Sequence, residues 1–343
     1  MPSSAQVQFR ENLAQQRATP LWDVLSSLVT PRPAPVAEPA SWAYEHMRPL
    51  LMRAGELITA REAERRVLIL ENPKLAGKSS VTDSLYAGLQ LVLPGEVAPS
   101  HRHSQSALRF VLEADGAWTS VDGERVYMQP FDLVLTANWR WHEHGNDGNG
   151  PAIWLDGLDI PIVAAFRAGH AEHQGNQAIA NRPLNDSHCR YGSGLKPVKA
   201  TSSERAGVHN PLFHYRFADW SAALRQTAAG SATDPHFGCI MEFCNPANGG
   251  SLSSTISAMA QHLPEGFVSR PSHQGASAVY VCVEGTVAVT VNGTSYALKP
   301  RDLVAVPIWA EVKFQTADQE TILFSYSERA SIEALGLWRE ERL

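Results

Sequence analysis

From about residue 84 onward, hydrophobic and polar positions follow one another in short alternating runs that turn residues interrupt. The first of these runs is LYAGLQLVLPGE at residues 85–96. Short strands separated by closely spaced turns are typical of a β-sandwich or β-barrel. Residues 42–58 and 61–70 instead have helical patterning, and they follow a proline-rich spacer at residues 31–40. We therefore expect a mainly β protein with a helical N-terminal extension.

Segments 107–142 and 278–312 share one order of features, which indicates an internal duplication. In both, a strand is followed by Glu and Gly, an alternating strand, a D-G or N-G turn and a P-x-D-L-V motif. Seven positions separate the turn glycine from the proline of the motif in both copies, and Trp139 then matches Trp309. A repeat of this kind predicts two copies of one β-barrel.

Four of the thirteen histidines form two i, i+2 pairs, His101 with His103 and His142 with His144. On a pleated strand, such spacing directs both rings of a pair to the same side. Arg109 has the same parity as His101 and His103, so one unbroken strand would place these three side chains on one face. Two imidazoles and a guanidinium on an interior face indicate a function.

The second copy of the repeat lacks these imidazoles. When the register is carried through, His142 falls opposite Val312, and the H-x-H pair falls near residues 271–275, which contain only His273. Imidazole is a common metal ligand, so two ligands from one strand and one from another predict a metal site with open positions. The alternatives are surface histidines on an edge strand and core histidines that bond to backbone carbonyls.

Length and composition exclude several classes of protein. A chain of 343 residues suggests two domains, and a net charge of -6 leaves no basic surface for nucleic acid or an anionic membrane. There is no apolar signal region and no run of about 18 apolar residues, so we expect a cytoplasmic protein. The four cysteines have no C-x-x-C spacing and are expected to be reduced.

The sequences GEVAPSHRH and WHEHGN, at residues 95–103 and 141–146, match the two cupin motifs. The stretches HRHSQSALRFVLE, VDGERV and WRWHEHGN, with the upstream TPLW and ERRVLILENP, resemble gentisate 1,2-dioxygenases and their relatives acting on salicylate and 1-hydroxy-2-naphthoate. The resemblance covers essentially the whole chain. It implies a bicupin of two double-stranded β-helix (jelly-roll) barrels, usually a homotetramer. It also implies one Fe(II) per subunit, held in the N-terminal cupin by His101, His103 and His142.

On this basis we expect four segments along the chain. Residues 1–80 are a helical or irregular extension, and residues 81–165 are the N-terminal cupin with the metal site. Residues 166–235 are a linker of irregular and helical structure, and residues 236–343 are a C-terminal cupin without metal. A helix at residues 331–341 is expected to close the chain.

One departure from the general cupin pattern determines the expected charge of the site. Many cupins have a glutamate ligand four or five residues after H-x-H, but Ala107 and Leu108 occupy those positions here. Three neutral imidazoles would leave the 2+ charge of the metal uncompensated, next to Arg109. Such a site favours a small aromatic acid with an ortho hydroxyl, whose carboxylate Arg109 engages. The alternative is a structural ion pair of Arg109 with Glu113 or Asp156.

The resemblance adds further site residues. Gln90 would hydrogen-bond a ligand, Arg65 would be a second carboxylate clamp, and Tyr86 would stack on or hydrogen-bond the aromatic ring. Asp156 would orient His144, and His144 would hydrogen-bond the substrate and shuttle a proton. The structural alternatives are an ordinary strand glutamine, a solvated helical arginine and a plain turn carboxylate.

We therefore predict an enzyme that uses Fe(II) and O2 to cleave gentisate between its carboxyl-bearing and hydroxyl-bearing carbons, giving maleylpyruvate, with Arg109 and His144 as catalytic residues. Salicylate and 1-hydroxy-2-naphthoate are the alternative substrates. Two further alternatives are a metal-dependent cupin sugar-phosphate isomerase and a non-catalytic bicupin that binds or stores a ligand. The missing glutamate argues against the isomerase, and the difference between the two copies argues against storage.

Overall fold

The computed structural model describes residues 3–173, 181–197 and 209–343. The chain divides into two units, one ending at Ala34 and the other beginning at Pro35. Within the described residues, no helix combines the length and the apolar character needed to span a bilayer. All four cysteines are free thiols.

The first unit consists of two helices, α1 (Ser4–Gln15) and α2 (Leu21–Leu28). Ser3 begins α1 with a capping box, in which its hydroxyl accepts from the backbone of Gln6 and the Gln6 side chain accepts from the backbone of Ser3. Residues 3–34 contain no buried side chain, so this unit has no hydrophobic core of its own.

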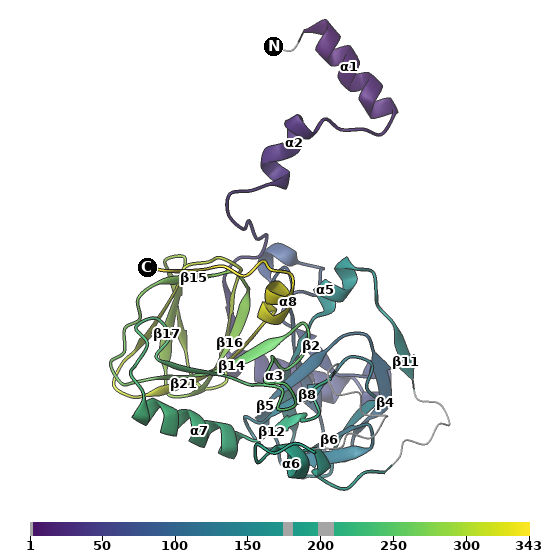
Figure 1. Cartoon of the computed structure of the whole chain (residues 1–343). Coiled ribbons are helices and arrows are strands. Elements are labelled where there is room, and N and C mark those ends of the chain that lie inside the picture. The colour runs from purple at the N-terminus through teal and green to yellow at the C-terminus, as the bar shows by residue number, and fades with distance from the viewer. Residues whose placement is uncertain (1–2, 174–180, 198–208) are drawn as a thin grey trace. The chain divides into compact units, whose positions relative to one another are not determined.

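The second unit contains two β-barrels, each built from a six-stranded and a five-stranded antiparallel sheet (Figure 1). In the N-terminal barrel the strand orders are β12-β8-β5-β10-β3-β2 and β11-β4-β9-β6-β7. The bounds of these strands are β2 (Val67–Ile69), β3 (Tyr86–Val92), β4 (Val97–His103), β5 (Ala107–Glu113), β6 (Ala117–Val121), β7 (Glu124–Tyr127), β8 (Leu133–Thr136), β9 (His142–Asn146), β10 (Ala152–Leu158), β11 (Ala171–His173) and β12 (His214–Tyr215).

The C-terminal barrel has the same arrangement, with the orders β1-β19-β16-β21-β14-β13 and β18-β17-β20-β15-β22. Every strand therefore has a counterpart in the other barrel, as the sequence repeat predicts. The bounds are β1 (Ala40–Trp42), β13 (Cys239–Glu242), β14 (Ser257–Leu263), β15 (Ser272–Gln274), β16 (Ala278–Glu284), β17 (Val287–Val291), β18 (Thr294–Leu298), β19 (Leu303–Val306), β20 (Val312–Thr316), β21 (Thr321–Ser327) and β22 (Glu340–Arg342). The helices of this unit are α3 (Tyr44–Leu57), α4 (Ala60–Ala63), η1 (Pro73–Leu75), α5 (Ile160–Ala165), α6 (Asp186–Tyr191), α7 (Phe217–Gly230) and α8 (Arg329–Ala334).

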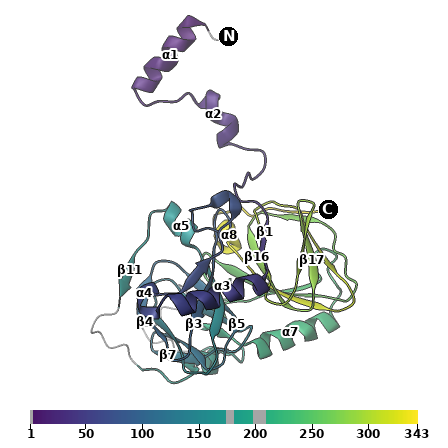
Figure 2. The same cartoon turned by 180° about the vertical axis from the view of Figure 1, so that it is seen from behind.

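Two segments cross between the barrels in equivalent ways. β1 pairs with β19 of the C-terminal barrel, whereas the following helix α3 packs on β3 of the N-terminal barrel (Figure 2). β12 pairs with β8 of the N-terminal barrel, whereas α7 packs on β13 and β14. In both cases the aspartate of the P-x-D-L-V motif accepts the first N–H of the helix, Asp302 from Tyr44 at 2.8 Å and Asp132 from Phe217 at 2.7 Å. The repeated unit therefore begins with β1 in one copy and β12 in the other. Both strands precede residues 81 and 236, where the two cupins were expected to start.

The main core lies between the two six-stranded sheets. Phe110 of β5 and Phe324 of β21 stack there, with ring centroids 3.9 Å apart. A second apolar cluster fills the interior of the C-terminal barrel and includes Tyr280, Val289 and Phe314. The interior of the N-terminal barrel instead contains buried polar side chains, which are the subject of the next section.

The predicted closing helix at residues 331–341 is wrong over its second half. α8 ends at Ala334, and Gly336 has a φ of 71°. Glycine in this left-handed conformation is a common helix terminator. The chain then forms β22, which pairs with β15, and local helical periodicity does not report such a distant partner.

Candidate metal centre

Three imidazoles converge inside the N-terminal barrel. β4 carries His101 and His103, and β9 carries His142, which lies directly across from His101 in the antiparallel pair. The ring centroids are 5.2 Å apart for His101 and His103, 4.1 Å for His101 and His142, and 4.9 Å for His103 and His142. One nitrogen from each ring lies within 4.8 Å of the other two, so the three rings can share one metal ion.

Backbone carbonyl groups orient two of these rings. Nδ1 of His103 donates to the carbonyl oxygen of Gln105 at 2.8 Å, and Nδ1 of His142 donates to that of Arg140 at 2.9 Å. With the proton on Nδ1, the lone pair of Nε2 is free to bind a metal. Nε2 of His142 is buried and has no hydrogen-bond partner among the described residues. This buried nitrogen without a partner fits a role as a metal ligand.

The third ring contacts an arginine from outside the barrel. Arg65 donates to Nδ1 of His101 and, at 2.8 Å, to the carbonyl oxygen of Pro99. Arg65 therefore lies against one of the two ring nitrogens that His101 could offer to a metal. The structure thus places Arg65 beside the three histidines, where it is held by contacts that a ligand can replace.

The three imidazoles are neutral at physiological pH. Burial, with Arg65 nearby, lowers the pKa of His101 to about 3, and burial, with Arg109 nearby, lowers that of His103 to about 4. Burial and the charge of Arg109 hold the pKa of His142 well below its usual range. Because a metal binds the deprotonated nitrogen, these rings can accept a cation without first losing protons.

Arg109 forms a buried ion pair with the residue opposite it on the neighbouring strand. Its Nε lies 3.5 Å from Oδ1 of Asp156 on β10, and its Nη1 donates to Oγ1 of Thr136 at 2.5 Å. Burial lowers the pKa of Arg109 to about 10 and raises that of Asp156 to about 6, so both are charged at neutral pH. Arg109 therefore pairs with Asp156 and not with Glu113, the other partner that the sequence suggested. Glu113 instead accepts from Arg48 and Tyr44.

The prediction that Arg109 shares one strand with His101 and His103 is wrong. A turn at residues 104–106 separates β4 from β5. Arg109 is nevertheless buried, and it lies close enough to both histidines for its charge to lower their pKa values.

His144 lies deeper in the barrel, fully buried, with its ring centroid 5.6 Å from that of His142. Its Nδ1 is 2.9 Å from the hydroxyl of Thr119, its partner across β6 and β9, and its Nε2 has no hydrogen-bond partner among the described residues. The prediction that Asp156 orients His144 is wrong, because Asp156 accepts from Trp154 at 3.1 Å and pairs with Arg109. Alternation along β6 could have indicated only which side of the strand Thr119 faces, not its pairing with His144.

Tyr86 and Gln90 lie on β3 with the same parity and are both buried. Burial and the negative charge of Asp156 raise the pKa of Tyr86 above its usual range, which places the phenol near that carboxylate. Gly88 between them lies opposite Asp156, and a Cβ added there would be 2.6 Å from Val67 and 2.7 Å from the Tyr86 hydroxyl. Only glycine leaves this tyrosine its present position.

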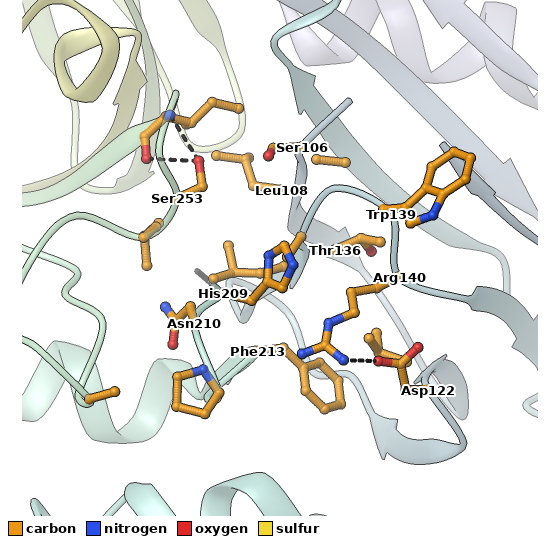
Figure 3. A pocket seen from close by; sticks show the side chains of 18 of the residues that line it. Ser106, Leu108, Asp122, Thr136, Trp139, Arg140, His209, Asn210, Phe213 and Ser253 are labelled. Atoms are coloured by element: carbon orange, nitrogen blue, oxygen red, sulfur yellow. Dashed lines mark hydrogen bonds and ion pairs between the residues drawn. The ribbon is translucent and has the colours of Figure 1, made fainter. Parts of the chain in front are cut away.

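A separate cavity of about 460 Å³ is lined in part by residues of β5 and β8, among them Leu108 and Thr136 (Figure 3). Arg140, paired with Asp122 at 2.6 Å, lies on one side of it and Ser253 of the C-terminal barrel on the other. The three histidines do not line this cavity, but Thr136 and Arg140, which hold Arg109 and His142, do. The sequence did not predict it.

Comparisons with known proteins agree with this arrangement. Residues 88–158 match the family described as Cupin domain. The chain is 44% identical to gentisate 1,2 dioxygenase 1 of Aquipseudomonas alcaligenes, covering 98% of this chain and 96% of that protein. It is 35% identical to 5-aminosalicylate 1,2-dioxygenase of Comamonas sp, covering 97% and 89%. The crystal structure of salicylate 1,2-dioxygenase from Pseudoaminobacter salicylatoxidans with gentisate superposes with a TM-score of 0.91 at 31% identity, covering 100% and 95%.

Proposed function

The chain belongs to the gentisate 1,2-dioxygenase family of ring-cleaving bicupins, and from this premise we propose that it cleaves gentisate with dioxygen. The bond broken lies between the carboxyl-bearing and the hydroxyl-bearing ring carbons, and the product is maleylpyruvate. The reaction belongs to the catabolism of aromatic compounds. The identity of 44% over nearly the whole chain, together with the three converging imidazoles, is the observation that carries this proposal.

His101, His103 and His142 would hold one Fe(II) per chain in the N-terminal barrel. Bound there, the ion would supply Lewis-acid and redox chemistry for the reaction of the substrate with O2. Neutral imidazoles and the unpartnered Nε2 of His142 support this assignment. The C-terminal barrel, where no metal is expected, differs at these positions. Its pair Ser272 and Val312 corresponds to His101 and His142.

Arg109 and Arg65 would bind the carboxylate of the substrate. Three neutral ligands leave the site positively charged, and Arg109 is fixed beside it by Asp156 and Thr136. The hydrogen bonds of Arg65 to the described residues go to His101 and the carbonyl oxygen of Pro99, so a substrate carboxylate can draw it away from the ring. Its departure would also uncover Nδ1 of His101.

His144, Gln90 and Tyr86 would complete the pocket. Nε2 of His144 is free while Nδ1 is held by Thr119, so it can bond to a substrate oxygen and hold or release a proton there. Gln90 and Tyr86 share one face of β3 and would contact the ring of the substrate and its polar groups. Asp156 would act on the substrate through Arg109.

Salicylate is the second candidate substrate, since the salicylate 1,2-dioxygenase structure is similar over the whole chain. The test of both is anaerobic loading with Fe(II), followed by measurement of oxygen uptake with gentisate, salicylate and 1-hydroxy-2-naphthoate. We expect the highest kcat/KM with gentisate and one equivalent of O2 consumed. A higher value with salicylate would replace the proposed substrate, and no uptake with any of the three would refute ring cleavage.

The enzyme would be a homotetramer. Four apolar side chains of α2 are largely exposed, namely Leu21 (56%), Trp22 (68%), Leu25 (48%) and Leu28 (67%). An isolated helix of eight residues is only marginally stable in water, so this helix needs a surface to cover it. A second copy of the chain would provide that surface.

A further inference from the structure

Arg102, which lies between two of the three histidines, has no contact with the metal centre itself. It points to the other side of β4, since neighbouring strand residues face opposite sides. Its guanidinium carbon lies 4.6 Å from the ring centroid of Trp139 and 4.7 Å from that of Trp141. Its Nε and Nη2 also donate to one carboxylate oxygen of Glu172, at 2.9 and 2.7 Å. One side chain therefore connects three segments, namely β4, β11 and the loop that precedes β9.

That loop determines the position of the third histidine. Arg140, between the two tryptophans, provides the carbonyl oxygen that orients His142. Trp139 has a φ of 63°, which is unfavourable for a bulky residue, and its N–H donates to the carbonyl oxygen of His103 at 2.7 Å. Stacking of Arg102 on both indoles holds the loop in this strained form against β4. The strand that carries His101 and His103 is thus tied to the segment that carries His142.

The C-terminal barrel has the same loop without this clamp. Trp309 has the same φ of 63°, and its N–H donates to the carbonyl oxygen of Gln274 at 2.9 Å. Gln274 therefore corresponds to His103, and His273, which stacks on Trp309 at 5.7 Å, corresponds to Arg102. Glu311 stands where the second tryptophan would be. The arginine and the second indole occur only in the copy that has the three histidines.

We propose that Arg102, stacked between Trp139 and Trp141 and paired with Glu172, is a positioning residue that sets the separation of His142 from His101 and His103. This inference rests on the proposed metal site. Groups that hold metal ligands in place typically contribute about 10- to 100-fold to metal affinity. Arg102 would contribute to metal affinity by fixing the positions of the segments that carry the ligands.

The sign of the effect separates this role from simple electrostatics. Arg102 is a cation near a cation site, so removing its charge would by itself strengthen metal binding. Loss of the clamp would instead let the two ligand-bearing segments move apart, which weakens metal binding. The two explanations therefore predict opposite changes in the dissociation constant.

The experiment is titration of the metal-free full-length protein with Co(II), followed by its visible d–d absorption, for wild type, Arg102→Met and Arg102→Lys. Arg102→Met should raise the dissociation constant about 10- to 100-fold and alter the absorption bands. Arg102→Lys keeps the charge but not the planar fork, so its loss should be smaller. If Arg102→Met does not fold, the Co(II) dissociation constant of Arg102→Lys decides, and the clamp requires it to exceed that of wild type.

A matched control exists in the C-terminal half of the chain. Arg329 stacks on Trp338 at 4.1 Å and donates to Glu333 at 2.7 Å, as Arg102 does to its partners. Arg329→Met should leave Co(II) affinity unchanged, even if both methionine variants lower the thermal midpoint. Wild-type affinity, or tighter binding, in both Arg102 variants would overturn the clamp. A wild-type protein that binds no Co(II) would overturn the metal site as well.

Discussion

His142 is the residue on which metal retention should depend most directly, because its Nε2 is buried and has no other partner among the described residues. We expect His142→Ala to lower bound iron from one per chain to below a tenth, since two imidazoles alone hold the ion weakly. The matched control is Val312→Ala, at the equivalent position of the other barrel, which should keep one iron per chain. Elemental analysis after desalting measures both, and full iron in His142→Ala would contradict the assignment.

Arg109 should contribute most of the affinity for the substrate carboxylate. Truncating this charged contact at a desolvated site should cost about 2 to 4 kcal/mol, or roughly 30- to 1000-fold in Kd. Anaerobic titration of Arg109→Ala with gentisate measures the change. Arg329→Ala is the control, because its guanidinium donates to Glu333 in the C-terminal half of the chain. An unchanged Kd in Arg109→Ala would show that this residue only neutralises Asp156.

Asp156 should make the stability of the metal-free protein depend on pH. Burial raises its pKa to about 6, above the ordinary value of 3.8, so the folded chain keeps a proton that the unfolded chain releases. The stabilisation is fully present below pH 4 and is lost as pH rises through about 6, a loss of about 3 kcal/mol. Urea unfolding from pH 4 to 7 should show this loss in wild type relative to Asp156→Asn. A parallel pH dependence in the two proteins would contradict it.

Sequence spacing predicted the histidines that the structure brings together but not the side chains that support them. The two H-x-H pairs are local patterns, and the repeat made their absence from the second copy visible. The partners of Arg109 and His144 come from strands that are distant in sequence, Asp156 on β10 and Thr119 on β6. Their register depends on how the barrel closes, which no local pattern contains.

At the scale of elements, the long alternating strands were predictable and the short ones were not. β1 has three residues and β12 has two, which is too few to show any alternation. Both lie in segments expected to be helical or irregular, and both add to the edge of a six-stranded sheet. They form because β19 and β8 offer unpaired backbone groups, a property of the assembled sheet.

Asp132 and Asp302 should contribute unequally to stability although they occupy equivalent positions. Both accept the first N–H of a helix and one N–H of their own turn. Asp132 also binds Nε2 of His214 at 2.7 Å. Asp132→Ala should therefore cost about 1 to 3 kcal/mol more than Asp302→Ala, because one more buried group loses its partner. Urea unfolding of the two variants measures the difference, and equal losses would show that the His214 contact contributes nothing.

At the scale of the whole molecule, the duplication explains how one barrel can specialise. The two barrels share strand order and pack through their six-stranded sheets, where Phe110 stacks on Phe324. The C-terminal barrel has an interior of apolar side chains, which makes it a hydrophobic support for its partner. The N-terminal barrel can then bury histidines, an arginine and an aspartate, groups that cost stability and serve chemistry.

The first unit should determine the oligomeric state. Removing residues 1–34 takes no residue from either hydrophobic cluster, so the two barrels should keep their fold, which circular dichroism checks. It does remove the exposed apolar side chains of α2, and we expect the tetramer to dissociate to a smaller species in light scattering. Leu25→Asp should weaken the tetramer in the same direction, whereas Ser26→Asp, which adds the same charge at an exposed polar position of α2, should not. A tetramer that survives both the deletion and Leu25→Asp would show that the barrels alone associate, and α2 would then need another partner.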